Sequence, residues 1–261
     1  LPQKKSEAGR QLWYQEIYDL AEFLEEKSGV KITAENLKER IEAHNRKRLA
    51  IKRVYETRKA NPAPISGKDA LLISQVAFYD DTERFTTKVN EIADELEQRV
   101  KEGIGAFEKN APRIMISGTP MAVPNWKVHH ILETSGASVV VEETCTGTRY
   151  FDHPVIESGA SDRDGVLRDI ADRYLDINCS CFTPNNERID QIVQLARDYN
   201  ADGVVYYVLQ FCHSYNIEYK RVEDRLKTEG LPVIKIETDY GTENTGQLST
   251  RLEAFLEQIK R

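Results

Sequence analysis

The second half of the chain alternates short apolar segments with helical ones, and this alternation limits the possible folds more than any other feature. Four apolar segments are expected to be strands, at residues 113–117, 138–141, 203–209 and 232–236. Helices are expected at 125–135, 163–175, 183–200 and 245–260, and another follows the third strand and reaches residue 230. Apolar strands joined by helices are typical of a parallel sheet that is covered on both faces. We therefore predict an α/β fold with an open, Rossmann or flavodoxin-like parallel sheet over residues 111–261.

Residues 1–110 follow the helical period instead. A first helix over residues 10–27 would present Leu12, Trp13, Ile17, Leu20, Ala21 and Leu24 on one face. Thr33 is a suitable N-cap for a second helix that reaches about residue 59. Its expected stripe is Leu37, Ile41, Arg48, Ile51 and Tyr55. Ser66 suggests another N-cap, and a charged helix is expected over 82–102. We predict a mainly helical segment, 1–110, that acts as a support or dimer arm.

Charge and hydropathy exclude several classes of partner. The net charge is −7, so we do not expect a basic surface large enough to neutralise a run of phosphates. We therefore expect neither nucleic acid nor an anionic membrane surface as a partner. No apolar run approaches the ~20 residues that span a bilayer, and the first residues lack the apolar core of a signal peptide. A cytoplasmic location is expected.

The four cysteines all lie in the predicted α/β domain, at Cys145, Cys179, Cys181 and Cys212. Two of them follow predicted strands, and the carboxyl ends of parallel strands meet at one edge of a sheet, where ligands bind. The loop with Cys179 and Cys181 is able to fold over the same edge. Thiolates gathered there indicate a soft metal or an iron–sulfur cluster. Four separately buried thiols are the alternative. Spacing does not distinguish zinc from iron–sulfur, although the absence of a CxxC pair disfavours a zinc ribbon.

Several polar residues near this edge are further candidates. Glu142 and Glu143 end the second strand and are able to act as acid or base, or simply to form ion pairs. Arg149 is suited to binding an anionic group or to a salt bridge. His153 and His213 lie in the same region, whereas His129 and His130 are expected to be structural. Gly118, Thr119 and Pro120 lack the glycine pattern of a nucleotide site.

Four stretches resemble the 2-hydroxyacyl-CoA dehydratase and benzoyl-CoA reductase family. They are 113–120 (RIMISGTP), 141–149 (VEETCTGTR), 203–212 (ending QFC) and 246–255 (GQLSTRLEAF), in the family's order. The segment from Leu1 to the helix of Trp13 also resembles the part that follows the family's first α/β domain. We therefore expect the sequence to belong to a longer protein. Ordinary members hold one [4Fe-4S] cubane on three cysteines. The EETCTG stretch and residues 178–185 (NCSCFTPN) look more similar to the double-cubane branch.

The resemblance implies a function and a set of ligands. Cys145, Cys212 and at least one of Cys179 and Cys181 would hold the cluster, while Gly147 would let the backbone pass close to it. Gln247, Thr250 and Arg251 match the family's last motif and would serve docking or packing. Glu143, Arg149 and His213 are the catalytic candidates. Residues 111–261 would thus form an α/β cluster-binding domain.

The favoured interpretation is a reductase component with a double-cubane [8Fe-9S] cluster. It would receive low-potential electrons from an ATP-hydrolysing iron–sulfur activator, reduce a small molecule, and work as a homodimer. The alternative is an (R)-2-hydroxyacyl-CoA dehydratase subunit with a single [4Fe-4S] cluster. An electron carrier without a substrate, and a metal-free binding protein, remain as further hypotheses.

Overall fold

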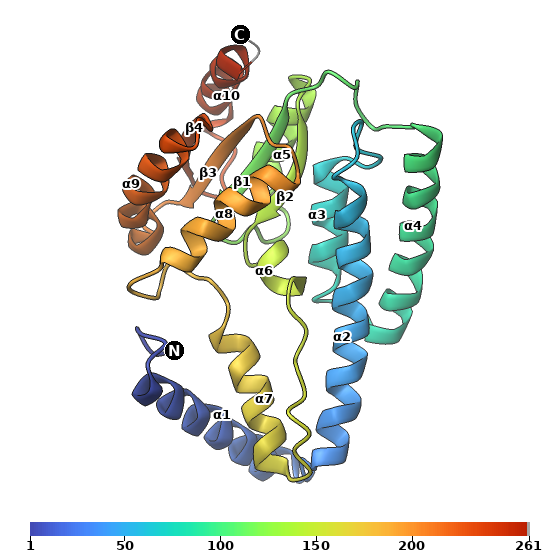
Figure 1. The fold of residues 1–261 in the computed structure, drawn as a ribbon, viewed down its shortest axis with the longest axis vertical. Helices are drawn as coiled ribbons and strands as arrows, with labels where there is room; N and C mark the ends of the chain where they lie inside the picture. The colour runs from blue at the N-terminus through green and yellow to red at the C-terminus, as the bar shows by residue number, and fades with distance from the viewer. Residues whose placement is uncertain (260–261) are drawn as a thin grey trace.

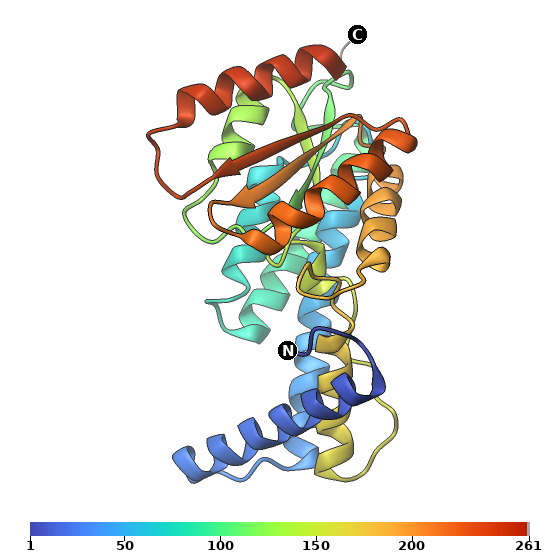
Figure 2. The same ribbon diagram turned by 90° about the vertical axis from the view of Figure 1, so that its left-hand side faces the viewer.

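The structure, a computed structural model, describes residues 1–259 and confirms the predicted α/β fold. Four parallel strands form one open sheet in the order β2-β1-β3-β4. In Figures 1 and 2 the sheet and its covering helices occupy the upper part of the molecule, and two helices from distant parts of the chain lie together below it. The strands are β1 (Arg113–Gly118), β2 (Ser138–Glu143), β3 (Gly203–Leu209) and β4 (Val233–Thr238).

The first four helices begin where the sequence places side chains suited to N-caps. They are α1 (Glu7–Ser28), α2 (Ala34–Thr57), α3 (Gly67–Val76) and α4 (Thr82–Glu102). In each, a Ser, Thr or Asp side chain accepts a hydrogen bond from a backbone N–H of the first turn. The caps at Thr33 and Ser66 are those that the sequence predicted. Gly29 and Gly103 end α1 and α4 in left-handed conformations, which glycine adopts without steric cost.

Helices cover both faces of the sheet. One face packs against α5 (Lys127–Thr134) and α10 (Thr245–Ile259). The other packs against α8 (Asn186–Asp198) and α9 (His213–Thr228), together with α2. β1, β2 and β3 are buried on both sides, which explains their apolar runs, whereas the edge strand β4 is only partly buried and carries Lys235 and Glu237.

The helical segment and the sheet share buried contacts. Ile51 and Tyr55 of α2 belong to the same apolar cluster as Met115 of β1 and Val140 of β2. Farther along the chain, α1 packs against α7 (Arg163–Leu175), and the indole N–H of Trp13 donates to the carbonyl of Ala171. The boundary near residue 110 stays a prediction.

Two details differ from the sequence prediction. The helix expected to begin at Thr183 begins at Asn186, because Thr183 and Pro184 belong to the loop and Asn185 turns its side chain back into that loop. A short helix, α6 (Thr148–Phe151), was not predicted, since four residues are too few to show a period. Within residues 1–259, no helix combines the length and apolarity that crossing a membrane requires.

Candidate cysteine site

The loops at the carboxyl edge of the sheet carry the four cysteines. Cys145 follows β2, Cys212 immediately precedes α9 after β3, and Cys179 and Cys181 lie in the loop between α7 and α8. Cys145 and Cys181 are exposed, whereas Cys179 and Cys212 are partly buried. All four are free thiols. The site is therefore built from one edge of the sheet and the loop that lies above it.

The Cys179 and Cys181 loop is held in a defined conformation. The backbone N–H of Phe182 donates to the carbonyl of Cys179 over 3.2 Å, and the side-chain amide of Asn185 donates to the same carbonyl over 2.9 Å. The N–H of Thr183 donates to the carbonyl of Gln3 over 3.0 Å, so the first residues of the chain pack against this loop. The loop therefore presents its two thiols from a fixed backbone.

Cys179 is the thiol most readily ionised. A hydrogen bond from the thiol of Cys181 lowers its pKa, and burial opposes this. The backbone N–H of Cys181 and the charge of Arg149 lower it further, so that the pKa of Cys179 falls to about 5. The same pairing raises the pKa of Cys181. The hydrogen bond between the two thiols thus favours the thiolate at Cys179 and the protonated thiol at Cys181.

Cys145 lies close enough to Cys179 for a charge on that sulfur to affect the pKa of Cys145. Although the residue is exposed, surrounding atoms desolvate its thiol and raise its pKa. The charge of Cys179 also raises it, whereas the guanidinium groups of Arg149 and Arg188 lower it. Three of the four predicted ligands therefore share one electrostatic environment, in which Arg149 and Arg188 favour thiolates and Glu143 opposes them.

Tyr215 links the loop to the buried charges. Its hydroxyl lies 3.8 Å from the sulfur of Cys179, and the Arg149 guanidinium donates to the same hydroxyl. Burial raises the pKa of Tyr215, so the hydroxyl keeps its proton and is able to donate it to a thiolate. Cys212 precedes α9, one turn before Tyr215, and thereby lies at the same edge. Tyr215 was not among the site residues predicted from the sequence.

Beneath the loop, Glu143 joins two buried arginines. Its carboxylate lies 2.9 Å from Nε of Arg149 and accepts from Nη2 of Arg188, also over 2.9 Å. The hydroxyl of Ser117 donates to the same carboxylate over 2.7 Å. Arg149 also donates to the carbonyls of Gly118 and Glu143 itself, at the ends of β1 and β2. These contacts tie the strand ends together under the thiols.

A second carboxylate completes the network. Glu218 of α9 pairs with Arg188 and accepts from the side-chain amide of Asn185 over 2.6 Å. Asn185 also donates to the carbonyl of Cys179. Cys179 is therefore linked to the buried charges twice, through Tyr215 at its sulfur and through Asn185 at its carbonyl. Two arginines and two glutamates balance, and the network holds no net charge of its own.

Glu142 points away from this network and forms a separate one. Its carboxylate accepts two hydrogen bonds from Arg58, each over 2.9 Å, and lies 2.9 Å from Nε2 of His129. All three side chains are fully buried. Burial opposes ionisation of Glu142, but the charge of Arg58 and the hydrogen bonds from His129 and Arg58 prevail and lower its pKa to about 2. Glu142 therefore has a structural role, as expected for His129.

The remaining predicted residues occupy varied positions. Gly147 is required for packing against β2, because a Cβ there would lie 2.1 Å from the carbonyl oxygen of Glu142. His213 and His153 are exposed. The last motif contributes three exposed residues on α10: Gln247, Thr250 and Arg251. Arg251 donates a hydrogen bond to the backbone carbonyl of Lys235. None of these contacts a cysteine through a hydrogen bond among the described residues.

Arg188 carries a sequence signal that was missed. It lies on the buried side of α8 together with Ile189, Ile192 and Val193, and it is fully buried. An arginine in the apolar stripe of a helix must find a buried partner, because leaving its charge unpaired is costly. Such an arginine therefore predicts a buried carboxylate nearby.

The donor set fits a cluster better than a single ion. Within the described part of the chain, no three His, Cys, Asp or Glu side chains are arranged to hold one metal ion. Thiolates are the usual ligands of iron–sulfur clusters, which are larger than one ion and space their ligands more widely. The partly exposed thiols over two buried cations agree with that chemistry. The buried hydroxyl of Ser180, between two cysteines, has no hydrogen-bond partner among the described residues.

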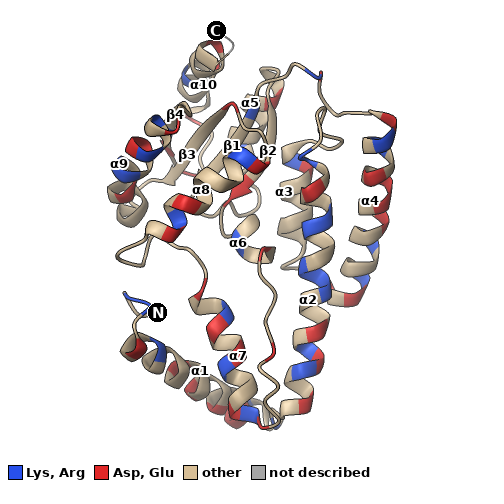
Figure 3. Cartoon of the chain, in the orientation of Figure 1, with Lys and Arg blue, Asp and Glu red and all other residues tan. Residues whose placement is uncertain are grey.

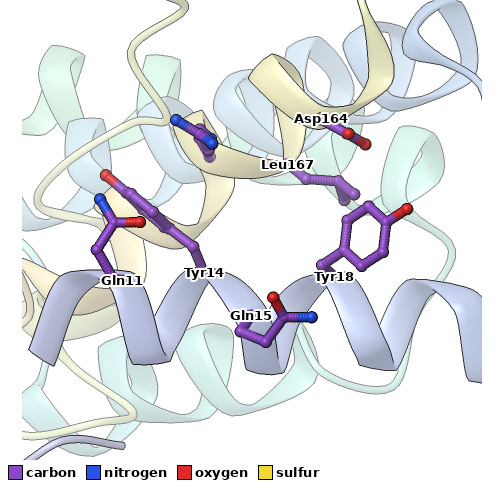
Figure 4. Close-up of a pocket in the computed structure, with 7 residues that line it drawn as sticks. Gln11, Tyr14, Gln15, Tyr18, Asp164 and Leu167 are labelled. Atoms are coloured by element: carbon purple, nitrogen blue, oxygen red, sulfur yellow. The ribbon is translucent and has the colours of Figure 1, made fainter. Parts of the chain in front are cut away.

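A polar cavity in the lower part of the molecule lies away from the cysteines. It has a volume of about 240 Å³ and lies between α1 and α7, where Tyr14, Tyr18 and Asp164 line it (Figure 4). No cysteine and no other predicted site residue lines it. The cysteine site is therefore a surface feature at the sheet edge rather than part of this cavity.

Comparison with known proteins identifies the family. A profile of the HGD-D family, described as 2-hydroxyglutaryl-CoA dehydratase, D-component, matches residues 1–259. The chain belongs to this family. The resemblance seen in the sequence is thereby confirmed. Curated relatives agree with the assignment, and they include subunits of both dehydratases and reductases.

Three relatives illustrate the range. YjiM of Escherichia coli (strain K12), which carries the name of a dehydratase subunit, is 35% identical over 257 residues. The (R)-phenyllactyl-CoA dehydratase beta subunit of Clostridium sporogenes is 26% identical over 257 residues, and one of the benzoyl-CoA reductase subunits of Thauera aromatica is 23% identical over 263 residues. Each alignment covers 98% of this chain and 65–66% of the relative. The chain thus spans slightly less than two thirds of their length.

Proposed function

We propose that this HGD-D family chain is the iron–sulfur component of a reductase. It would receive low-potential electrons from an ATP-hydrolysing activator and transfer them to a small molecule. The observation that carries the proposal is the grouping of Cys145, Cys179 and Cys181 above the buried cations Arg149 and Arg188. Thiols grouped at one edge are suited to ligating a cluster, and the lowered pKa of Cys179 favours its thiolate form.

In this proposal four residues hold the cluster: Cys145, Cys179, Cys181 and Cys212. A bound iron–sulfur cluster supplies one-electron chemistry at a potential that hydrogen bonds and burial tune. We favour the double-cubane [8Fe-9S] form, because the chain offers more thiols than the three that a single cubane takes in ordinary family members. A homodimer and a cytoplasmic location complete the proposal.

The residues below the thiols have positioning roles. The Tyr215 hydroxyl lies 3.8 Å from the sulfur of Cys179 and would donate to a thiolate there, while Arg149 donates to that hydroxyl. Glu143 holds Arg149 and Arg188 in place, and it is closed off from solvent. Glu143 is therefore better suited to organising the site than to exchanging protons with a substrate. The exposed His213 stays a catalytic candidate, since its ring is free to meet a substrate at the edge.

A dehydratase subunit is the second candidate function. Two of the relatives are named as beta subunits of (R)-phenyllactyl-CoA and (R)-2-hydroxyglutaryl-CoA dehydratases, and these names favour an acyl-CoA substrate. In that case a single [4Fe-4S] cluster on three of the cysteines would be sufficient. The names of the relatives do not separate the two cluster types.

An electron-delivery assay separates the two functions. Full-length protein, purified without oxygen, is mixed with an ATP-hydrolysing activator of this family, ATP and a low-potential reductant. The reductase proposal predicts an ATP-dependent electron paramagnetic resonance signal and no dehydration of (R)-2-hydroxyacyl-CoA. Dehydration of the thioester, with measurable CoA binding, would establish the second function. If no ATP-dependent signal forms, the electron-transfer proposal is wrong.

A further inference from the structure

Midway along α2, two cations, Lys47 and Arg48, are buried without a carboxylate partner among the described residues. Figure 3 shows a blue band there, where residues 46–48 are Arg, Lys and Arg. Lys47 and Arg48 are each only 4% exposed. The Lys47 ammonium donates to the carbonyl of Ala77 over 3.0 Å, and Arg48 donates to the amide oxygen of Asn45 over 3.0 Å. Both acceptors are neutral, so the two positive charges are not balanced by these contacts.

Arg48 is the less satisfied of the two. Its second contact, with the hydroxyl of Tyr174, spans 3.4 Å, and its buried Nε has no hydrogen-bond partner among the described residues. The other buried arginines are better satisfied: Arg113 and Arg173 each donate several hydrogen bonds to backbone carbonyls, and three more have a carboxylate partner. Arg58, Arg149 and Arg188 each lie within 2.9 Å of a glutamate oxygen. Burying a guanidinium without a counter-ion is costly, so the position favours an anion that the described part of the chain does not supply.

A cavity opens beside this arginine. It has a volume of about 140 Å³ and lies between α2, α7 and the segment that precedes α7. Its polar lining includes the cations Arg40 and Arg48 with His44 between them, spaced by four residues along one side of α2. The remainder of the wall is largely apolar, and Ile41 and Ile170 contribute to it. The cavity thus joins positive charge at one side to hydrocarbon at the other.

The pKa of His44 is affected by the same excess of positive charge. Burial lowers its pKa, and the charges of Lys47, Arg48 and Arg40 lower it further. No acidic group counteracts these three cations at the imidazole. Tyr174, across the cavity on α7, is the other titratable residue that lines the wall. The electrostatic environment is therefore one that an anion would stabilise.

We propose that this cavity binds a small organic carboxylate with a short hydrocarbon tail. The carboxylate pairs with Arg48, with His44 and Arg40 at the mouth, and the tail packs against Ile41 and Ile170. A fully hydrated anion without a tail fits less well, because it leaves the apolar wall without a partner. The site uses none of the cysteines, so this inference goes beyond the proposed function and stands independently of it.

Equilibrium dialysis of the full chain with radiolabelled butyrate tests the binding. The expected result is saturable binding of one butyrate per chain, with n-butanol, which has the tail but no charge, failing to compete. Inorganic phosphate and acetate are expected to compete at least about tenfold more weakly than butyrate, because phosphate lacks the tail and acetate has only a single methyl group. An absence of saturable binding, or phosphate competing as strongly as butyrate, would overturn the proposal.

Variants locate the site. Arg48→Gln is expected to weaken butyrate binding at least about tenfold, because a charge-assisted contact is lost. Arg46→Gln is the matched control on the same helix, since Arg46 is more exposed and pairs with Glu42 and Glu83; its binding should equal that of the wild type. Binding that survives Arg48→Gln unchanged would contradict the assignment.

A second variant keeps the test decisive if Arg48→Gln fails to fold. His44→Glu places a carboxylate one helical turn from both Arg40 and Arg48, in the order that favours an ion pair with Arg48. We expect it to abolish butyrate binding and to melt at a higher temperature than the neutral His44→Gln variant. A melting temperature for His44→Glu at or below that of His44→Gln would show that the cavity does not require an anion.

Discussion

The hydroxyl of Tyr215 lies 3.8 Å from the sulfur of Cys179, and Arg149 donates to that hydroxyl from the buried side. This relationship joins an exposed loop to a charge network that is closed to solvent. The loop alone would leave the thiols on flexible backbone. Through Tyr215 and Asn185, the same network supports both the sulfur and the carbonyl of Cys179. The buried charge network therefore also holds Cys179 in position.

Replacing Tyr215 by Phe tests the contact with the sulfur. The variant removes a hydrogen bond to a ligand sulfur, so the bound cluster should become harder to reduce, with a potential more negative by on the order of tens of millivolts. Iron content should not change. The measurement is a redox titration followed by electron paramagnetic resonance. Tyr219→Phe, on the same helix but bonded to Glu223, is the control and should not shift the potential.

The fully buried pair of Glu142 and Arg58 should govern stability. Replacing Glu142 by Gln leaves Arg58 without its counter-ion, and we expect a loss of about 3–5 kcal/mol in the free energy of unfolding. Urea unfolding at pH 7 measures it. The exposed pair of Lys88 and Glu91 gives the control, because Glu91→Gln should cost less than about 1 kcal/mol. A cost for Glu142→Gln no larger than the control's would refute the role of the pair.

The same variant has a predictable dependence on pH. The pKa of Glu142 falls from an ordinary 4.5 to about 2 in the folded protein. A carboxylate with a depressed pKa stabilises the fold above its unfolded pKa, and that stability is lost as the pH falls toward the folded pKa. The difference in stability between wild type and Glu142→Gln should therefore be constant above about pH 5 and shrink as the pH falls below it. A difference that grows with acidification would contradict this sign.

Arg188 and Glu218 should be energetically coupled. Removing either partner leaves a buried charge, so Arg188→Met and Glu218→Leu should each cost about 3–5 kcal/mol. The double variant should cost less than the sum, because Glu143 retains Arg149 and no charge is left alone. A double-mutant cycle in urea measures the coupling. The exposed pair of Lys220 and Asp224 should couple by less than about 1 kcal/mol. Additive costs for the buried pair would show that the network is not one unit.

Cys212 is the predicted ligand with the least structural support, so its variant is informative. Cys212→Ala should lower the iron bound per chain in anaerobic preparations, because a thiolate ligand is lost. Ser180→Ala, between the two cysteines of the loop, is the control and should leave iron unchanged. A colorimetric assay measures the iron bound per chain in each variant. An iron content for Cys212→Ala equal to that of the wild type would remove this residue from the ligand set.

Much of the fold follows from the sequence because its signals are local. Apolar segments, N-caps and glycine stops predicted the four strands and most helices, with bounds close to those observed. The start of α8 was predicted three residues too early, because Thr183 and Pro184 form a good local cap and the sequence does not show that Asn185 is drawn back toward Cys179. A contact across the loop decided that boundary.

The site was predictable only in part. The cysteines were recognisable because few residue types serve soft metals, and parallel strands place their ends together. The charges beneath them were not, since Glu143 and Arg188 lie 45 positions apart and nothing in one sequence marks them as partners. Charged residues are usually exposed. Their position on the buried side of a strand or helix is the signal that would have revealed them.

Whether these cysteines hold a cluster is decided by the iron and acid-labile sulfide per chain, in full-length protein purified without oxygen. We expect about eight irons with a similar amount of sulfide, as a double cubane requires, and an amount that falls when a ligand cysteine is replaced. About four irons would favour the single cubane and the dehydratase function. Protein that folds, stays anaerobic and contains no iron would contradict the claim that the four thiols bind a cluster.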